Sequence, residues 1–482
     1  MTTPFDIRLY PMVLVGCMLV TGILLGDILY SDTLLSLLPW LMTLLLICFL
    51  IALRLGRHSN ILLLVALIVF GMLRISVSRH NLDVSLPSTE CEYDAVIVSD
   101  PTVHGKVVWM DMLIVSPDAH PLAVKASLLR DTITHRYRQL HVGSGIRAHS
   151  LLEKENRSVR TFIYYKSWQA ATVSLQSLSY FQRTRLRLLV LRQRLADVFG
   201  NQSVVRAMVL GDKSQLTREL RSDYSVSGVS HLLALSGLHL SIIYGFLSLL
   251  AFRLRRRALV QIAILVIVWG YVLLVGMMPS IVRAASMLSI YSVTVILSRD
   301  RLPVNTWASA GVLMLIANPQ CLWDIGFLMS FLAVLSIILL FPLITRLPLL
   351  SRLCEWRIGR WGVDMLGVTL AAQIGTMPII AHVFGRVSVY GLFVNFAAVP
   401  LATLLVGLAV AGLCLAWSGL LFPFLHSALS FVSHLLNSLV ALSASLPGAS
   451  LQIHFSLAQT ICLYILLGVV VFFFSRFLPQ ES

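Results

Sequence analysis

Long apolar stretches recur along most of the chain, with short polar loops between them. Most approach the roughly 20 residues that a helix needs to cross a bilayer core of about 30 Å. We place twelve such stretches, at 10–30, 34–53, 60–77, 229–252, 258–276, 280–297, 303–318, 326–345, 364–384, 388–416, 420–445 and 457–475. The pattern predicts an α-helical polytopic membrane protein with about 12 spans.

A polar interval from about residue 77 to residue 201 interrupts this pattern. Within residues 92–175, short β-branched and aromatic runs are separated by turn signals such as Asp100-Pro101 and His104-Gly105. About five short strands with turns predict one small extracytoplasmic β-barrel domain, OB-like in type. Residues 181–225 carry an apolar stripe beside many arginines, which predicts helices lying along the membrane surface.

These patterns divide the chain into five parts. The expected parts are an N-terminal three-span region at 1–77, the OB-like domain at 78–180, interfacial amphipathic helices at 181–227, a larger transmembrane domain at 228–477 and a tail at 478–482.

Composition agrees with the apolar pattern. Apolar residues make up 57% of the chain and charged residues 12%, with a mean hydropathy of +0.85. Soluble proteins have about 45–50% and about 25% of these residues, respectively. The balance excludes a soluble enzyme, a disordered chain and a disulfide-stapled secreted domain. No CxxC motif or Cys/His cluster predicts a metal, and we expect no cofactor.

Basic residues select one orientation. Arginines follow the second, fourth, sixth, eighth and twelfth spans, whereas the first loop carries Asp27 and Asp32 and no base. Loops rich in Lys and Arg stay in the cytoplasm, which places both termini inside and residues 78–227 outside. Lys and Arg number 37 against 22 Asp and Glu, a net charge of +15 that can also attract a polyanion.

Part of that charge is concentrated in the polar interval. From Arg130 to Arg194, 13 basic residues stand against 3 acidic ones, a net +10 over 65 residues with aromatic residues between them. A basic groove with stacking platforms binds single-stranded nucleic acid. Lipid headgroup contacts and a barrel core would give the same composition. The candidate binding residues are Arg136, Arg138, Arg147, Lys154, Arg157, Arg160, Lys166, Tyr164, Tyr165 and Trp168.

The fourth apolar run opens with an unusual polar cluster. It contains Ser230, His231, Ser236, Gly237 and His239. Ser236-Gly237 predicts a broken helix, whose exposed N–H groups and positive dipole end suit an anionic backbone such as phosphate. Small and hydrogen-bonding residues also allow close helix packing, and both interpretations stay open.

Other polar residues lie in later runs. Pro279 stands where a helix starts, and Arg283 lies one turn inside it. A buried arginine costs roughly 3 kcal/mol on insertion scales, so we expect a phosphate contact, snorkelling or a pair with Asp324. Asp324 can also cap a helix. Gln373 and Asn395 serve either packing or the same path.

The sequence contains no motif of a hydrolase. The 13 histidines form no HxH, HxxxH or HExxH motif, and neither a phosphate-binding GxxxxGK[ST] loop nor a GxSxG elbow occurs. We therefore expect no catalytic residues and no enzyme activity.

Several stretches together resemble one family. The stretch formed by Leu210–Leu216, Leu220-Arg221 and Ser227–His239 strongly resembles the core signature of the ComEC competence channel family. Later stretches resemble its other motifs in order, namely Pro279–Ala284, Asn318–Phe331, Gln373–Pro378 and Asn395–Pro400. The resemblance covers about 205–400 and is weaker elsewhere.

The resemblance implies import of single-stranded DNA through the larger transmembrane domain into the cytoplasm, across the bacterial inner membrane, during natural transformation. Many members carry a metallo-β-lactamase-like domain, and we expect a short form without it because this chain stops at Ser482. Expected partners are single-stranded DNA, the lipid bilayer, a separate nuclease, a DNA receptor and a cytoplasmic motor, with homo-oligomers as an option. The alternatives are a small-anion or proton-coupled transporter and a non-conducting envelope scaffold.

Overall fold

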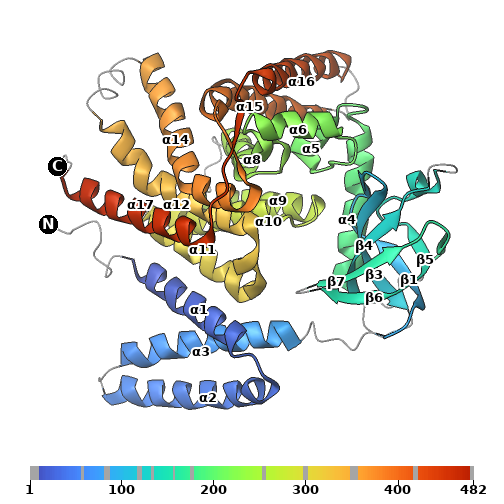
Figure 1. Ribbon diagram of the computed structural model, residues 1–482. Coiled ribbons are helices and arrows are strands. Elements are labelled where there is room, and N and C mark those ends of the chain that lie inside the picture. Colours follow the sequence, from blue (N-terminus) through green and yellow to red (C-terminus); the bar gives the residue numbers. More distant parts are fainter. Residues whose placement is uncertain are drawn as a thin grey trace.

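The computed structural model describes residues 10–55, 59–80, 87–116, 122–131, 135–155, 158–173, 178–251, 257–296, 302–347, 357–415 and 422–477. Helices dominate it, and one β-rich unit lies to one side of them (Figure 1). Within these residues, nine helices are long and apolar enough to cross a membrane. Three shorter apolar helices at Gly237–Leu249, Ala258–Leu274 and Pro303–Ala317 coincide with the remaining predicted runs. The chain is thus a polytopic helical membrane protein, as predicted.

The N-terminal helices are α1 (Pro11–Ile28), α2 (Asp32–Leu55) and α3 (Ser59–His80). Glycines allow α1 and α3 to pack backbone against backbone, because a Cβ at Gly26 would lie 2.7 Å from the Cα of Met72. An ion pair between Arg79 and Asp27, at 3.0 Å, joins the C-terminal ends of the two helices. α1 also packs against α11 (Pro303–Ala317), which attaches the group to the rest of the molecule.

The β-rich unit contains eight short strands. They are β1 (Cys91–Ile97), β2 (Thr102–His104), β3 (Val107–Ser116), β4 (Leu122–Leu129), β5 (Gly145–Ser150), β6 (Leu152–Glu155), β7 (Ser158–Ile163) and β8 (Trp168–Ala170). The strand order is β6-β7-β4-β3-β1-β5-β8, and β2 pairs with β3. Pairing therefore leaves two ends, at β6 and β8, and the closed OB-like barrel predicted from the sequence is not shown.

Strand alternation places the core of this unit on one face. Val108, Met110 and Met112 of β3 are buried, whereas Trp109 between them points outward. The period of two follows from the pleat, since successive side chains of a strand point to opposite faces. The 3-10 turn η2 (Arg136–Gln139) adds Tyr137 to the buried side.

Three helices connect the β-rich unit to the remaining helices. They are α4 (Tyr180–Asp197), which stands beside the β-rich unit in Figure 1, α5 (Ser203–Leu210) and α6 (Arg218–Val226). Residues 204–210 of α5 are all buried, because α5 packs against α15 (Gly391–Leu415) and α16 (Phe422–Ser445). The placement of 181–227 along a membrane surface stays a prediction, and α5 has no exposed polar face to support it.

The larger helical part begins with a short helix. Its elements are α7 (Ser230–Leu233), α8 (Gly237–Leu250), α9 (Arg257–Leu274), α10 (Pro279–Ile296), α11, the 3-10 turn η4 (Pro319–Trp323), α12 (Ile325–Thr345), α14 (Arg357–Phe384), α15, α16 and α17 (Leu457–Phe477). The short strands β9 (Arg386–Ser388) and β10 (Ser450–Gln452) pair with each other beside α14 and α15. Pro279 is the first residue of α10, where its missing N–H has no helical partner to lose.

Candidate functional site

The helix break predicted at Ser236-Gly237 is present. α7 ends at Leu233, Ala234 and Ser236 have extended backbone angles, and α8 starts at Gly237. His239 is fully buried in the first turn of α8, and its Nδ1 accepts the backbone N–H of Ser236 at 3.3 Å. That bond leaves the proton of a neutral ring on Nε2, which is buried without a partner. The break therefore presents an unused N–H donor inside the protein, together with the Ser236 hydroxyl, which is also buried without a partner.

Arg283 is the second unsatisfied group. Its side chain is 2% exposed, so it does not snorkel to the surface. One nitrogen, Nη2, donates to the Ser280 hydroxyl at 2.9 Å, while Nε and Nη1 are buried without partners. Asp324 interacts with it electrostatically but forms no ion pair with it in the described part of the chain. The Asp324 carboxylate instead accepts the Phe327 N–H at 2.6 Å and caps α12, as predicted.

These two groups belong to neighbouring helix starts. A Cβ on Gly237 would lie 3.4 Å from the Cβ of Ala284, the residue after Arg283. The loop before α10 is sharply turned, with positive φ angles at Gly276 (95°) and Met277 (57°). The N-terminal ends of α8 and α10 thus meet close to an unpaired guanidinium, an arrangement that favours an anion.

A second polar group forms where the later motifs meet. The turn after α6 contains Gly228, at φ +79°, and a Cβ there would lie 2.7 Å from the Cβ of Ser388. A Cβ on Gly391, the first residue of α15, would lie 3.2 Å from Nε2 of Gln373 and 3.3 Å from the Ser388 hydroxyl. Residues about 160 positions apart in the sequence therefore share one small site.

The second group also contains unpaired polar atoms. The Ser388 Oγ is buried without a partner, and so is the Oδ1 of Asn395, one turn into α15, whose residue is 5% exposed. The sequence identified Gln373 and Asn395, but Ser388, the last residue of β9, stands at the start of the tenth predicted run and gave no signal there.

Along the chain, the short helix α7 lies between Gly228, which contacts the polar group around Gln373 and Ser388, and the helix break at Ser236. The Ser230 hydroxyl donates to the carbonyl of Tyr224 at 3.2 Å, which ties α7 to α6. Both Ser230 and His231 are exposed, and the His231 ring interacts electrostatically with His239. Pro279 and Asp324 are exposed as well. Of the predicted path residues, His239, Arg283 and Asn395 are therefore buried, and Ser236, Gly237 and Gln373 are half-buried. The exposed ones are Ser230, His231, Pro279 and Asp324.

An aromatic row covers the outer face of the β-rich unit. Strand register places Trp109 opposite Ser127, and Ser127 opposite Phe162. Trp109 and Phe162 are 53% and 43% exposed, and the Phe162 ring meets Tyr164 edge to face at 5.2 Å between centroids. The neighbouring row on β3, β4 and β7 is Asp111, Lys125 and Arg160. The sequence analysis missed Trp109, although alternation along β3 was the available signal, and it left Phe162, one of the aromatic residues of the basic stretch, out of the candidate list.

The predicted external residues have mixed outcomes. The exposed ones are Arg136, Arg138, Arg147, Lys154, Arg160, Tyr164, Tyr165 and Lys166. Arg147 is held by Asp94 at 2.8 Å. Trp168 is wrong as a stacking platform, because it is 5% exposed and the Arg136 guanidinium covers its ring. Arg157 lies outside the described residues.

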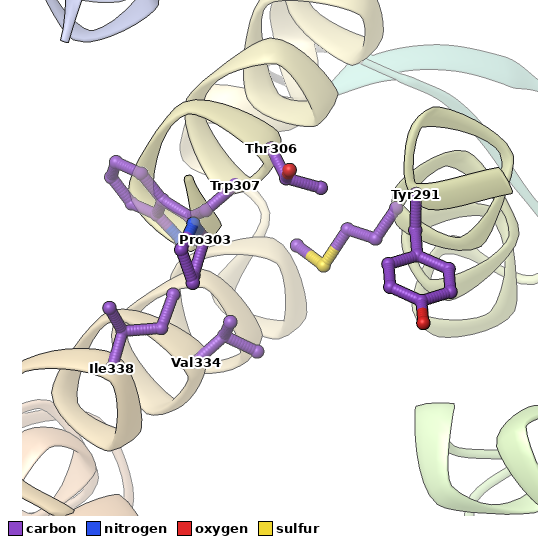
Figure 2. Close-up of a pocket in the computed structure, with 7 residues that line it drawn as sticks. Tyr291, Pro303, Thr306, Trp307, Val334 and Ile338 are labelled. Carbon is purple, nitrogen blue, oxygen red and sulfur yellow. The ribbon is translucent and has the colours of Figure 1, made fainter. Parts of the chain in front are cut away.

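An apolar groove of about 310 Å³ lies elsewhere, among α10, α11 and α12. Figure 2 shows Tyr291, Pro303, Trp307, Val334 and Ile338 around it. Its lining is almost entirely apolar and carries no cationic side chain, so it does not suit a phosphate. Among the described residues, no three His, Cys, Asp or Glu side chains gather in a way that could hold a metal ion.

The fold and the polar groups define a multi-pass membrane protein with buried, unpaired donors at a helix break. A model of the family described as competence protein matches residues 208–477, more than half of the chain, so the chain belongs to the competence protein family. ComE operon protein 3 of Bacillus subtilis (strain 168) is 24% identical over 408 residues, which cover 80% of this chain and 51% of that protein. The chain spans about half the length of this curated relative. No solved structure matches this chain.

Proposed function

We propose that this chain conducts single-stranded DNA into the cytoplasm during natural transformation. Its family and its similarity to ComE operon protein 3 support a role in competence. The observation that carries the conducting role is Arg283, a buried guanidinium whose Nε and Nη1 have no partner. A charge in this position is costly unless a counter-charge visits it, and a passing phosphate supplies one.

The neighbouring groups fit the same ligand. Nε2 of His239 offers a further donor, and the starts of α8 and α10 add their positive dipole ends. The second group, at Gln373, Ser388 and Asn395, offers amide and hydroxyl groups that can contact a strand without fixing its sequence. Together they line a route in which a phosphate passes from the charged Arg283 to the neutral polar side chains of the second group.

The β-rich unit would collect the strand. Trp109, Phe162 and Tyr164 offer exposed rings, and base stacking on such rings is worth about 1–3 kcal/mol per base. Lys125 and Arg160 in the next row would contact phosphates. Two features of this unit support an OB-like form. β4 and β7 form a parallel pair. β5 and β6, which only Leu151 separates, pair with different strands, β5 with β1 and β6 with β7.

The proposal includes an orientation and partners. It places the chain in the bacterial inner membrane with twelve spans, cytoplasmic termini and residues 78–227 outside. The twelve apolar helices and the basic loops support this arrangement. A DNA receptor, a separate nuclease and a cytoplasmic motor would supply the steps before and after conduction. Catalysis is not part of the role proposed for this chain.

Uptake of labelled DNA into the cytosol tests the proposal. A transformable host deleted for its own copy would carry the wild-type chain, Arg283→Gln, His239→Gln or the double variant. Arg360→Gln, which removes an exposed arginine from α14, is the matched control. Losing a charge-assisted bond of about 1.5–3 kcal/mol predicts a roughly tenfold to hundredfold drop for Arg283→Gln, with external DNA binding unchanged.

The double variant decides the question. Normal uptake in cells that express Arg283→Gln with His239→Gln at wild-type levels would refute the route. Equal losses in the Arg360→Gln control would show that the assay reports total charge rather than a path.

A further inference from the structure

One hairpin of the β-rich unit lies against the start of α6. A Cβ on Gly105, in the β2–β3 turn, would lie 3.0 Å from Nη2 of Arg218, the first residue of α6. Trp109 lies on the same hairpin, opposite Thr102. The loop between α5 and α6, residues 211–217, precedes this contact. The junction therefore combines an exposed ring of the β-rich unit with the basic start of α6.

Two carboxylates at this junction are already neutralised. Asp100, in the loop after β1, pairs with Arg192 of α4 and accepts from Gln193 at 3.0 Å. Asp212 pairs with Arg206 at 2.6 Å and accepts the Ser214 hydroxyl at 2.6 Å. Burial alone would raise the pKa of Asp212, but the Ser214 hydrogen bonds and the Arg206 charge outweigh it and hold this pKa low. Each carboxylate has its own arginine.

Three cations then remain without a counter-charge. Within the described residues, Lys213, Arg218 and Arg221 form no ion pair, although Glu219 and Asp223 lie in α6 with the two arginines. The Arg221 Nη2 donates to the Lys213 carbonyl at 2.6 Å, which draws its guanidinium toward Lys213. Its Nε is buried without a partner. Burial and the Arg221 charge lower the pKa of Lys213, so the fold keeps two like charges together at a cost.

We infer that Lys213, Arg218 and Arg221 bind backbone phosphates of single-stranded DNA where the β-rich unit meets the helices. This inference rests on the proposed function and assigns the transfer point between the aromatic row and the helix break. A strand carries bases and phosphates together, which matches a hairpin that bears the exposed Trp109 ring and approaches Arg218. A lipid headgroup fits these cations less well, because Lys213 and Arg221 are half-buried rather than on an apolar surface.

The test uses the full chain in nanodiscs of neutral phosphatidylcholine and a fluorescent mixed-sequence oligonucleotide. Binding is measured by anisotropy over a range of salt concentrations for the wild type and for Lys213→Gln with Arg218→Gln. Each phosphate contact on a single strand contributes about −0.7 to the slope of log affinity against log salt. The double variant should therefore flatten the slope by about 1.4. Arg357→Gln with Arg360→Gln, both exposed on α14, removes the same charge and should leave the slope unchanged.

Thermal melting separates binding from folding. Neither Lys213 nor Arg218 makes a side-chain hydrogen bond or ion pair in the described part of the chain, so their variants should melt at the wild-type temperature or above it. A wild-type slope in the double variant would overturn the inference, as would an effect seen only with anionic lipid. If the wild type itself bound no oligonucleotide, the proposed function would fail instead.

Discussion

At the scale of single residues, an arginine proposed to bind DNA differs from a structural arginine in having no carboxylate partner. Arg206 is as buried as an arginine of a stable core, and Asp212 satisfies it at 2.6 Å. Arg283 is also buried but has a single hydroxyl partner, Ser280. A buried charge without a counter-charge destabilises the fold, so its presence favours a ligand that arrives later.

Glycine at position 228 should be required for the second polar group. Gly228→Ala forces a left-handed residue, at about 1–2 kcal/mol, and brings its Cβ to 2.7 Å from the Cβ of Ser388. We expect a lower melting temperature and reduced DNA uptake. Gly245→Ala is the control, because nothing lies within 4 Å of its Cβ position in α8.

A second variant isolates the contact. Combining Gly228→Ala with Ser388→Gly removes the clash but keeps the backbone strain, so it should recover part of the lost stability. Equal melting of Gly228→Ala and Gly245→Ala would contradict the close approach of the α6–α7 turn to β9.

Residue chemistry was partly predictable from the sequence. His239 and Arg283 stand out because polar residues in apolar runs are rare and costly. Ser388 does not, since a serine at the very start of an apolar run is ordinary until the fold brings Gly228 against it. Trp168 misled for the opposite reason: an aromatic residue beside basic ones fits a binding surface or a core, and only strand pairing decides between them.

At the scale of elements, α4 is the connector between the β-rich unit and the helices. Its Arg192 and Gln193 hold Asp100, and its Arg185 donates to the carbonyl of Gly276 at 3.4 Å, just before α10. One helix thus contacts both the loop after β1 and the loop that leads to Arg283. This arrangement gives the β-rich unit a defined position relative to the helix break.

Removing Arg192 should loosen that connection. Arg192→Ala leaves the carboxylate of Asp100 buried and unpaired, which costs about 3–5 kcal/mol for a buried pair. We expect faster hydrogen exchange in residues 98–104 and a lower melting temperature. The change Arg192→Met with Asp100→Leu replaces the pair with apolar groups and should restore most of the stability. A single variant as stable as the wild type would show that the pair does not hold the unit.

The sequence pattern predicted some helices and strands better than others. The twelve apolar runs became helices because length and hydropathy are local properties. The helix break followed from Ser236-Gly237 alone. The strand order did not, because β4 and β7 pair across an intervening β5 and β6, and no local period encodes which strands meet. For the same reason, the row formed by Trp109, Ser127 and Phe162 emerged only from the register.

At the scale of the whole molecule, orientation decides whether these parts form one route. DNA arriving from outside can meet the aromatic row first only if the β-rich unit lies outside the cytoplasm. The charge pattern predicts that side, since arginines follow alternate spans. Long polar segments cross membranes largely regardless of their charge, so the +10 stretch from Arg130 to Arg194 does not oppose this orientation.

Cysteine labelling tests the orientation directly. In a variant whose 7 native cysteines are replaced, Lys166→Cys marks the β-rich unit and Arg360→Cys marks the start of α14, both at exposed positions. A membrane-impermeant maleimide should label Lys166→Cys in intact spheroplasts and Arg360→Cys only after permeabilisation. The reverse pattern would place the aromatic row and the cations at Lys213 in the cytoplasm. DNA would then meet the helix break before them, so they could receive a strand leaving the membrane but could not collect one entering it.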